Sequence, residues 1–350
     1  MDSILVLGSD GDIGKKVVDA LIKKGINILE TTRNIKKVRK NKFFIDITEY
    51  ENLKQLIQQA DLVINCVGPS YKYKDRVIKI ANELNKHYID VFGGDLLEKD
   101  LLNVKECVSV VNAGCEPGIT GILPKFFKRE FSSDVKLKIF SGGRSMGGNA
   151  ALADIILSSI AGYSKNDFCI KNNCILKSKE NLKNITLKID DNLIKVSARP
   201  YLTKENERFA SRYEVNNLCS YRIITDKEID NIIKSSCIEL IKSERIEDFN
   251  KIVLSAWEEL SKIPQNNWYC IKVEKLIKEE KKECVTLVSK DSSMLTSLLI
   301  VLVVDKILKG KIKNGGYWAF EVVGFEEFVD FLSSSEYDIK IIYDNREEKI

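Results

Sequence analysis

The chain has 350 residues, of which 44% are hydrophobic and 30% are charged, a balance that excludes a disordered, collagenous or coiled-coil protein and suffices for two domains. Its 55 lysines and arginines against 51 acidic residues leave a net charge of +4, which is too small and too dispersed to predict binding to nucleic acid. His87 is the single histidine, so a histidine-rich zinc site is excluded and no metal site is expected.

Cysteine usage and hydropathy predict a cytoplasmic protein. Nine cysteines are scattered without a CxxC motif, which is typical of free thiols in a reducing compartment. No signal-peptide pattern is found at the N-terminus, and the longest apolar run, residues 298–304, is far shorter than the roughly 20 residues that a membrane helix needs. We therefore expect a core helix at this run and no association with a membrane.

Short apolar segments alternate with amphipathic segments along the first third of the chain. Strands are predicted at residues 3–7, 26–31, 43–47, 61–66, 87–91 and 107–111, and helices at residues 12–24, 49–59 and 75–85. Strands separated by helices of this length form parallel βαβ units. The sequence thus predicts an α/β fold with a Rossmann-type doubly wound parallel sheet.

The turn after the first strand carries three glycines at regular spacing. It reads Gly8-Ser9-Asp10-Gly11-Asp12-Ile13-Gly14. In such a turn the first glycine allows a tight reversal, the second lets backbone N–H groups approach a pyrophosphate, and the third permits close packing of the helix on the strand. We interpret these seven residues as a dinucleotide-binding turn; the alternative is a glycine turn without a ligand.

The end of the second strand indicates which dinucleotide is bound. An NAD site usually has an acid there for the ribose 2′-OH, whereas an NADP site has small or hydroxyl residues and an arginine for the 2′-phosphate. In this chain Thr32-Arg33-Asn34 occupies the turn and Glu30 comes two residues early. NADP(H) is therefore favoured, with Arg33 as the partner of the phosphate. In the alternative, Arg33 is a solvated surface charge and Glu30 binds the ribose of NAD.

Four further segments carry a family resemblance. They are residues 65–69 (NCVGP), 87–90 (HYID), 112–118 (NAGCEPG) and 315–323 (GGYWAFEVV). In this order they resemble the conserved turns of the saccharopine dehydrogenase-like oxidoreductases. The chain departs from that family at Ser70-Tyr71, where phenylalanine is common, and at Ala319, where proline is usual. These departures point to a different substrate from that of saccharopine reductases.

The resemblance implies further residues near the cofactor, because ligands of open α/β sheets lie at the carboxyl ends of the strands. Residues 66–69 are expected to line the path from adenosine to nicotinamide, and residues 46–47 to flank the adenine. The added cofactor-binding residues are Asp46, Ile47, Cys66, Val67, Gly68, Pro69 and Cys115. The alternatives are structural: Pro69 ends a strand, and the two cysteines fill the core.

The same implication gives catalytic and substrate-binding candidates. Asp90 and Tyr71 are the candidate proton-transfer groups, with a bound water as the alternative, and His87 is a weaker candidate at the edge of the site. Tyr88 and Glu116 are expected to contact the substrate near the nicotinamide.

Residues 121–290 lose the βαβ rhythm and are predicted to form an α+β substrate-binding and dimerisation domain inserted into the dinucleotide-binding domain of residues 1–120 and 291–350. Strands are predicted at 135–140, 185–189 and 193–198, and helices at 226–243 and 246–262, which suits an antiparallel sheet with helices on one face. The resembling family dimerises through this domain, so a homodimer is expected. A glycine-rich turn, residues 141–149, offers Arg144 and Asn149 to a substrate carboxylate; the alternative is a flexible loop.

The sequence and the resemblance together predict an NADP(H)-dependent oxidoreductase acting on a C=N or C=O carbon of an amino-acid-like or carboxylated small molecule. Two alternatives remain open. One is a non-catalytic NADP-binding sensor that holds a partner protein, and the other is a reductase of hydrophobic ketone or enoyl substrates.

Overall fold

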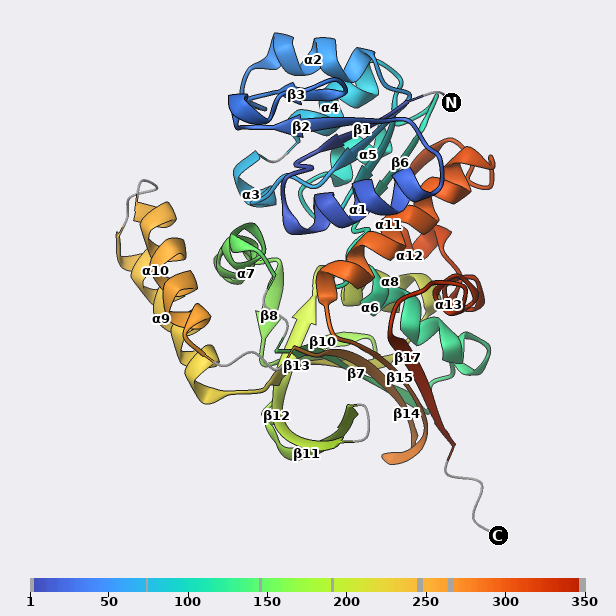
Figure 1. Ribbon diagram of the computed structural model, residues 1–350. Helices are drawn as coiled ribbons and strands as arrows, with labels where there is room; N and C mark the ends of the chain where they lie inside the picture. The colour runs from blue at the N-terminus through green and yellow to red at the C-terminus, as the bar shows by residue number, and fades with distance from the viewer. Residues whose placement is uncertain are drawn as a thin grey trace. The chain divides into compact units, whose positions relative to one another are not determined.

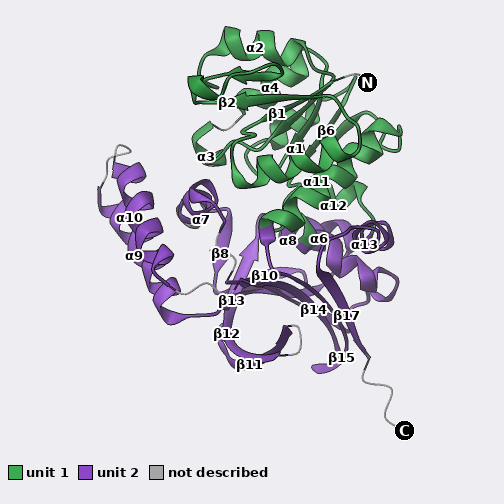
Figure 2. Ribbon diagram, in the orientation of Figure 1, with its two compact units in different colours: residues 1–119, 293–324 green, residues 120–292, 325–350 purple. Residues whose placement is uncertain are grey.

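The computed structural model describes residues 3–73, 75–144, 147–189, 192–243, 248–263 and 267–345. Within it the chain divides into two compact units (Figure 2). The first comprises residues 1–119 and 293–324, and the second comprises residues 120–292 and 325–350.

The first unit is built on a seven-stranded sheet in which every pair of neighbouring strands is parallel. The strand order is β16-β6-β5-β4-β1-β2-β3, with helices on both sides of the sheet (Figure 1). The strands are β1 (Ile4–Leu7), β2 (Ile28–Thr32), β3 (Lys42–Phe44), β4 (Leu62–Asn65), β5 (His87–Asp90), β6 (Val108–Val111) and β16 (Gly315–Trp318). This is the predicted doubly wound architecture.

The helices of the first unit follow from apolar residues at helical spacing, as in α1, where Val17, Val18 and Leu21 are buried against the sheet. The helical segments are α1 (Asp12–Lys23), η1 (Ile35–Lys37), α2 (Tyr50–Gln58), α3 (Ser70–Tyr73), α4 (Arg76–Glu83), α5 (Glu98–Leu102), α11 (Ser292–Leu308) and α12 (Ala319–Val322). The apolar run of residues 298–304 lies in α11 and is buried, as predicted. Among the described residues, no helix has the length and hydropathy of a membrane span.

Two details of this sheet differ from the prediction. The third strand ends at Phe44 and not at residue 47, because Asp46 turns the chain by accepting hydrogen bonds from the amide and hydroxyl of Thr48. The edge strand β16 was not predicted, since two of its four residues are glycines. Gly316 is needed there: a Cβ on it would lie 2.4 Å from the carbonyl oxygen of Leu101.

The second unit contains a ten-stranded sheet and a separate group of helices. Its strands are β7 (Val135–Gly143), β8 (Ser164–Asn166), β9 (Phe168–Lys171), β10 (Cys174–Lys177), β11 (Leu182–Ile189), β12 (Asn192–Thr203), β13 (Asn217–Ile224), β14 (Tyr269–Ile277), β15 (Glu280–Ser289) and β17 (Ile339–Asn345). The sheet is mixed and not wholly antiparallel, because β13 runs parallel to β7.

The helical segments of the second unit are α6 (Ile119–Ile122), η2 (Leu123–Glu130), α7 (Asn149–Ala161), α8 (Lys204–Tyr213), α9 (Lys227–Ser243), α10 (Phe249–Ser261) and α13 (Phe325–Ser333). Helices α7, α9 and α10 bury their apolar faces against one another.

The end of the chain was assigned to the wrong domain. The sequence placed all of residues 291–350 with the dinucleotide-binding domain, whereas residues 325–350 belong to the second unit. Strand β17 pairs antiparallel with β15, and the Phe325 ring packs 5.1 Å from the Phe126 ring. Pairing between strands that are distant in sequence leaves no local signal, so composition alone does not place this segment.

Candidate functional site

The β1–α1 turn has the backbone geometry of a dinucleotide cradle. Gly8 has a φ of +76°, and a Cβ on it would lie 2.8 Å from the carbonyl oxygen of Cys66. A Cβ on Gly14 would lie 2.2 Å from the carbonyl oxygen of Gly8, so only glycine lets α1 start this close to β1. A Cβ on Gly11 would be less crowded, because its nearest neighbour, the Gly8 carbonyl oxygen, would lie at 3.2 Å. The predicted roles of the first and third glycines therefore match the structure.

Backbone donors are available at the start of α1. The first intrahelical bond runs from the Lys15 N–H to the Gly11 carbonyl oxygen, at 3.0 Å. The N–H groups of Asp12, Ile13 and Gly14 consequently have no acceptor within the helix, and they carry the positive end of its dipole. Three such donors behind a glycine turn fit a pyrophosphate.

Ser9 has a different role from the predicted one. Its side chain is 1% exposed, and its hydroxyl donates to the Thr31 carbonyl oxygen at 2.8 Å. The Gly8 N–H donates to the Thr31 hydroxyl at 2.9 Å. Ser9 thus ties the turn to β2 and does not present its hydroxyl to a ligand. Thr31 completes this tie and was not singled out from the sequence.

The end of β2 brings together the residues predicted to select the dinucleotide. Thr32 donates its hydroxyl to the Asp10 carboxylate at 2.6 Å, and it accepts the Asn34 N–H at 3.0 Å. Arg33 is exposed between them. The Asn34 side chain caps η1 by accepting the Lys36 N–H at 3.0 Å. The backbone of the turn is therefore fixed, while the guanidinium of Arg33 extends into solvent.

Glu30 is not placed as a ribose acceptor. One carboxylate oxygen pairs with Arg39 and the other with Lys42, both at 2.8 Å. The pKa of Glu30 is raised by burial, but the hydrogen bonds and charges of Lys42 and Arg39 lower it further, so the net shift is downward. Because both oxygens are engaged, the alternative in which Glu30 binds the ribose of NAD has no support in this structure.

Asp46 and Ile47 follow β3 on the same edge of the sheet. The hydrogen bonds from Thr48 lower the pKa of Asp46, and the positive charges of Arg33 and Arg76 lower it further. Ile47 is buried. Asp46 thus lies within electrostatic reach of Arg33, which agrees with a shared position beside the adenosine end of the turn.

A buried polar cluster joins the carboxyl ends of β4 and β5. Asp90 accepts hydrogen bonds from the Tyr88 hydroxyl, from the Asn65 amide at 2.9 Å and from the Phe92 N–H at 3.0 Å. Asn65 in turn accepts the Val67 N–H at 3.2 Å. Asn65 appears in the motif that carried the resemblance, but no role was predicted for it. The cluster fixes the two loops that follow these strands.

Burial raises the pKa values of the titratable groups in and beside this cluster. Burial raises the pKa of Asp90 to about 6, against the opposing effect of its three hydrogen bonds. Burial and the Asp90 charge raise the pKa of Tyr88 well above its ordinary value and also raise that of the Cys66 thiol. Tyr88 is wholly buried, so it does not contact a substrate as predicted. Asp90 is 5% exposed, which favours a positioning role over direct proton transfer.

The loop after β4 is the more open part of this edge. Cys66, Val67, Gly68 and Pro69 are all half-buried, in contrast to the fully buried strand before them. Tyr71 follows in α3, half-buried, with its ring 5.6 Å from the ring of Phe92. Partial exposure of the whole loop agrees with the predicted path for a cofactor.

His87 does not belong to this site. It is the first residue of β5 and pairs in register with Leu62, the first residue of β4, at the amino end of the sheet. Its Nδ1 accepts the Val108 N–H at 3.0 Å. Three residues of strand, roughly 10 Å, separate it from Asp90. The predicted catalytic role of His87 is wrong because the strand direction places it at the opposite edge.

The turn after β6 is tightly packed. Cys115 is buried, and its N–H donates to the Thr296 hydroxyl at 3.0 Å. Glu116 is half-buried beside it. Asn112 is wholly buried and accepts the Gly94 N–H at 2.8 Å, which links this turn to the loop after β5. Of the two predicted residues here, Glu116 is the more accessible.

In the second unit, the first three residues of the glycine-rich turn are strand. Gly142 and Gly143 end β7, and a Cβ on Gly143 would lie 2.1 Å from the Trp268 carbonyl oxygen, so these glycines serve strand pairing. The Arg144 N–H donates to that carbonyl at 2.7 Å, and its guanidinium pairs with Asp226 at 2.9 Å. Asn149 is the exposed first residue of α7. Residues 145 and 146 of the predicted turn lie outside the described residues.

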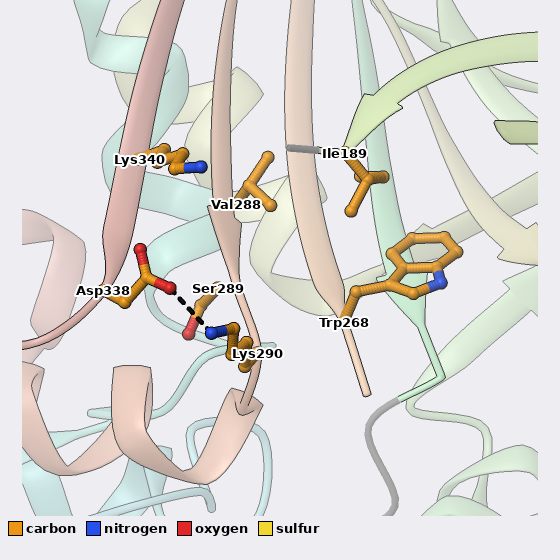
Figure 3. Close-up of a pocket in the computed structure, with 7 residues that line it drawn as sticks. All are labelled: Ile189, Trp268, Val288, Ser289, Lys290, Asp338 and Lys340. Carbon is orange, nitrogen blue, oxygen red and sulfur yellow. Dashed lines mark ion pairs between the residues drawn. The ribbon is translucent and has the colours of Figure 1, made fainter. Parts of the chain in front are cut away.

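The second unit also holds a small pocket formed by β14, β15, β17 and the β11 end (Figure 3). Its lining residues are Ile189, Trp268, Val288, Ser289, Lys290, Asp338 and Lys340. Lys290 and Asp338 form an ion pair of 2.9 Å at one side of it. None of the predicted site residues lines this pocket. In the described ranges, no group of three or more His, Cys, Asp or Glu side chains is placed to hold a metal ion.

Comparisons with known proteins agree with this architecture. Residues 4–110 match the family described as the saccharopine dehydrogenase NADP binding domain. The structure is similar to apo histidine-tagged saccharopine dehydrogenase (L-Glu forming) from Saccharomyces cerevisiae, with a TM-score of 0.67 and 14% identity over 98% of this chain and 100% of that one. It is also similar to a meso-dapdh mutant with DAP from Clostridium tetani E88, with a TM-score of 0.50 and 16% identity over 96% and 97% of the two chains. No curated protein matches the sequence.

The family match and the first of these structures confirm the predicted resemblance and fold. The match covers β1 to β6, which is where the glycine turn and the buried cluster lie.

Proposed function

We propose that this chain, which carries a saccharopine dehydrogenase NADP binding domain at residues 4–110, is an NADP(H)-dependent oxidoreductase acting on a C=N or C=O carbon of an amino-acid-like or carboxylated small molecule. The observation that carries the proposal is the β1–α1 turn, where Gly8 and Gly14 leave no room for a Cβ and the first turn of α1 offers unpaired N–H groups. The two similar solved structures, a saccharopine dehydrogenase and a meso-dapdh mutant with DAP, support a substrate of the amino-acid type.

The residues of the first unit fit a dinucleotide in three parts. The amides of Asp12, Ile13 and Gly14 would hold the pyrophosphate. Arg33 would pair with a 2′-phosphate, since its guanidinium is exposed at the end of β2. The half-buried loop of residues 66–69 would line the path to the nicotinamide, which supplies or accepts the hydride when the cofactor is bound.

The protein has to place the reacting groups and move one proton. Tyr71 is our candidate for that proton, because it directly follows the half-buried loop after β4. Asp90 acts through its neighbours: its hydrogen bonds to Asn65 and to the Phe92 N–H hold the loops after β4 and β5 in place. Asp90 is therefore a positioning residue in this proposal.

Glu116 is the substrate-binding candidate of the first unit. The substrate-binding roles of Arg144 and Asn149, in the second unit, stay predictions. Arg144 already pairs with Asp226, so a substrate carboxylate would compete for a guanidinium that remains partly exposed. A homodimer formed through the second unit stays a prediction.

The test is binding followed by turnover. NADPH fluorescence is titrated with the purified protein, with NADH as the control, and the complex is then mixed with a panel of 2-oxo acids, each with and without an amino-acid partner. We expect NADPH to bind and its oxidation to depend on a carboxylated substrate. Absence of binding by either dinucleotide would refute the proposal. Binding without turnover on any carboxylated substrate would favour the non-catalytic sensor instead.

A further inference from the structure

Asp10 lies in the glycine turn, immediately before Gly11, and reaches the end of β2. One carboxylate oxygen accepts the Thr32 hydroxyl at 2.6 Å and lies 3.6 Å from the Lys37 ammonium. The other lies 2.9 Å from the Lys42 ammonium. The side chain is 30% exposed. An acid is thus present at this edge, but it comes from the first turn and not from the second strand, where dinucleotide sites usually carry it.

The Asp10 carboxylate is ionised at neutral pH. Burial raises its pKa, but the hydrogen bonds from Thr32 and Lys42 and the charges of Lys42 and Lys37 lower it more, so the net shift is downward. A negative charge therefore stands next to the segment Thr32-Arg33-Asn34 at neutral pH.

Three cations stand beside Asp10 and Glu30: Lys42, Lys37 and Arg39, which pairs with Glu30. Lys42 is almost buried and divides its ammonium between Asp10 and Glu30, at 2.9 and 2.8 Å. Lys37 is 53% exposed and lies at the longer distance of 3.6 Å, where solvent screens the pair. Asp10 consequently opposes the field of Arg33 at the position that distinguishes the two dinucleotides.

We infer that Asp10 sets the cofactor preference of this site. Its carboxylate lowers the affinity for a 2′-phosphate relative to that for a 2′-hydroxyl. It thereby limits the preference for NADP(H) over NAD(H) that Arg33 creates. This inference rests on the proposed function. The physical basis is repulsion between a carboxylate and a phosphate of charge about −1.5 to −2, which a ribose hydroxyl does not experience.

The test compares two matched variants by binding alone. Asp10→Asn removes the charge and keeps an oxygen for the Thr32 hydroxyl. Asp12→Asn removes an equivalent charge from the same turn; its carboxylate pairs with Lys16, at the start of α1. Dissociation constants for NADPH and NADH are measured for each variant and for the unmodified chain by fluorescence titration at low salt.

We expect Asp10→Asn to raise the NADPH affinity relative to the NADH affinity by about tenfold, and Asp12→Asn to move both affinities together, because both dinucleotides carry the pyrophosphate. The gain should shrink at about 0.5 M salt, since screening shortens the reach of the charge. Because the ratio is taken within one variant, a partly unfolded sample lowers both affinities and leaves the ratio intact.

An unchanged ratio in Asp10→Asn, or an equal change in Asp12→Asn, overturns the inference while leaving dinucleotide binding in place. Failure of the unmodified chain to bind either dinucleotide overturns the proposed function instead. If Asp10→Asn does not fold, Asp10→Ser removes the same charge with a smaller side chain, and the same ratio decides.

Discussion

Replacing Asp90 by asparagine removes the buried carboxylate at the end of β5 and makes a pH-dependent prediction about the first unit. Burial raises the pKa of Asp90 from 3.8 to about 6. An acid whose pKa is higher in the folded state binds its proton more tightly there, so folding stability falls as the pH rises from the unfolded to the folded pKa. The shift of roughly two pKa units corresponds to about 3 kcal/mol in full, of which about 2 kcal/mol is lost between about pH 4.5 and pH 7.5.

The assay is amide hydrogen exchange of β4 and β5 in the unmodified chain and in Asp90→Asn, which gives the free energy of opening at each pH. The variant carries a constant offset, because asparagine cannot accept every hydrogen bond that the carboxylate accepts. The pH-dependent part isolates Asp90, because the other carboxylates are the same in both proteins and contribute equally to both. The difference should therefore move by about 2 kcal/mol in favour of the variant as the pH rises. A difference that stays flat refutes the burial argument.

Three further predictions concern the dinucleotide site. Arg33→Ala should weaken NADPH binding by about tenfold and leave NADH binding nearly unchanged, measured by fluorescence titration, because it removes the guanidinium at the end of β2. Gly14→Ala should abolish binding of both dinucleotides, since its Cβ meets the Gly8 carbonyl oxygen at 2.2 Å. Gly11→Ala, with its nearest contact at 3.2 Å, should retain a measurable fraction of the binding. Equal losses of binding in the two variants would contradict the dinucleotide cradle. Tyr71→Phe should lower kcat by 10²-fold or more with NADPH affinity unchanged, and a kcat within threefold of the unmodified chain would exclude Tyr71 as the proton donor.

Local signals predicted the cofactor half of the molecule well. Gly8 and Gly14 act through their own backbone and that of a neighbouring turn, so their spacing in the sequence carries most of the information. The strands β1 to β6 are short apolar runs between amphipathic helices, and their order along the chain determines the sheet class. For the same reason residues 66–69, which directly follow a buried strand, were placed at the correct edge.

Side-chain partners from distant segments were not predictable. Lys42 pairs with Asp10, 32 residues away in the sequence, and with Glu30, 12 residues away. This pairing occupies the Glu30 carboxylate and leaves Asp10 as the more exposed acid beside the end of β2. His87 is the first residue of its strand, whereas the candidate site lies where the strands end. The parallel register therefore places it at the opposite edge of the sheet. The sequence predicts ligand contacts at Tyr88 and Ser9, but both side chains are buried and form hydrogen bonds within the protein.

Both sheets of this protein are completed by strands that emerge late in synthesis. The edge strand β16 pairs with β6 about 200 residues upstream, and β17 pairs with β15 more than 50 residues upstream. A ribosome that has made only residues 1–290 has therefore released all of the glycine turn and the buried Asp90 cluster, while the β6 edge and the β15 edge are still bare. The first unit lacks an edge strand until β16 is made, and the second unit lacks one until β17 is made. The β edges exposed during these intervals are the feature that a chaperone would have to cover.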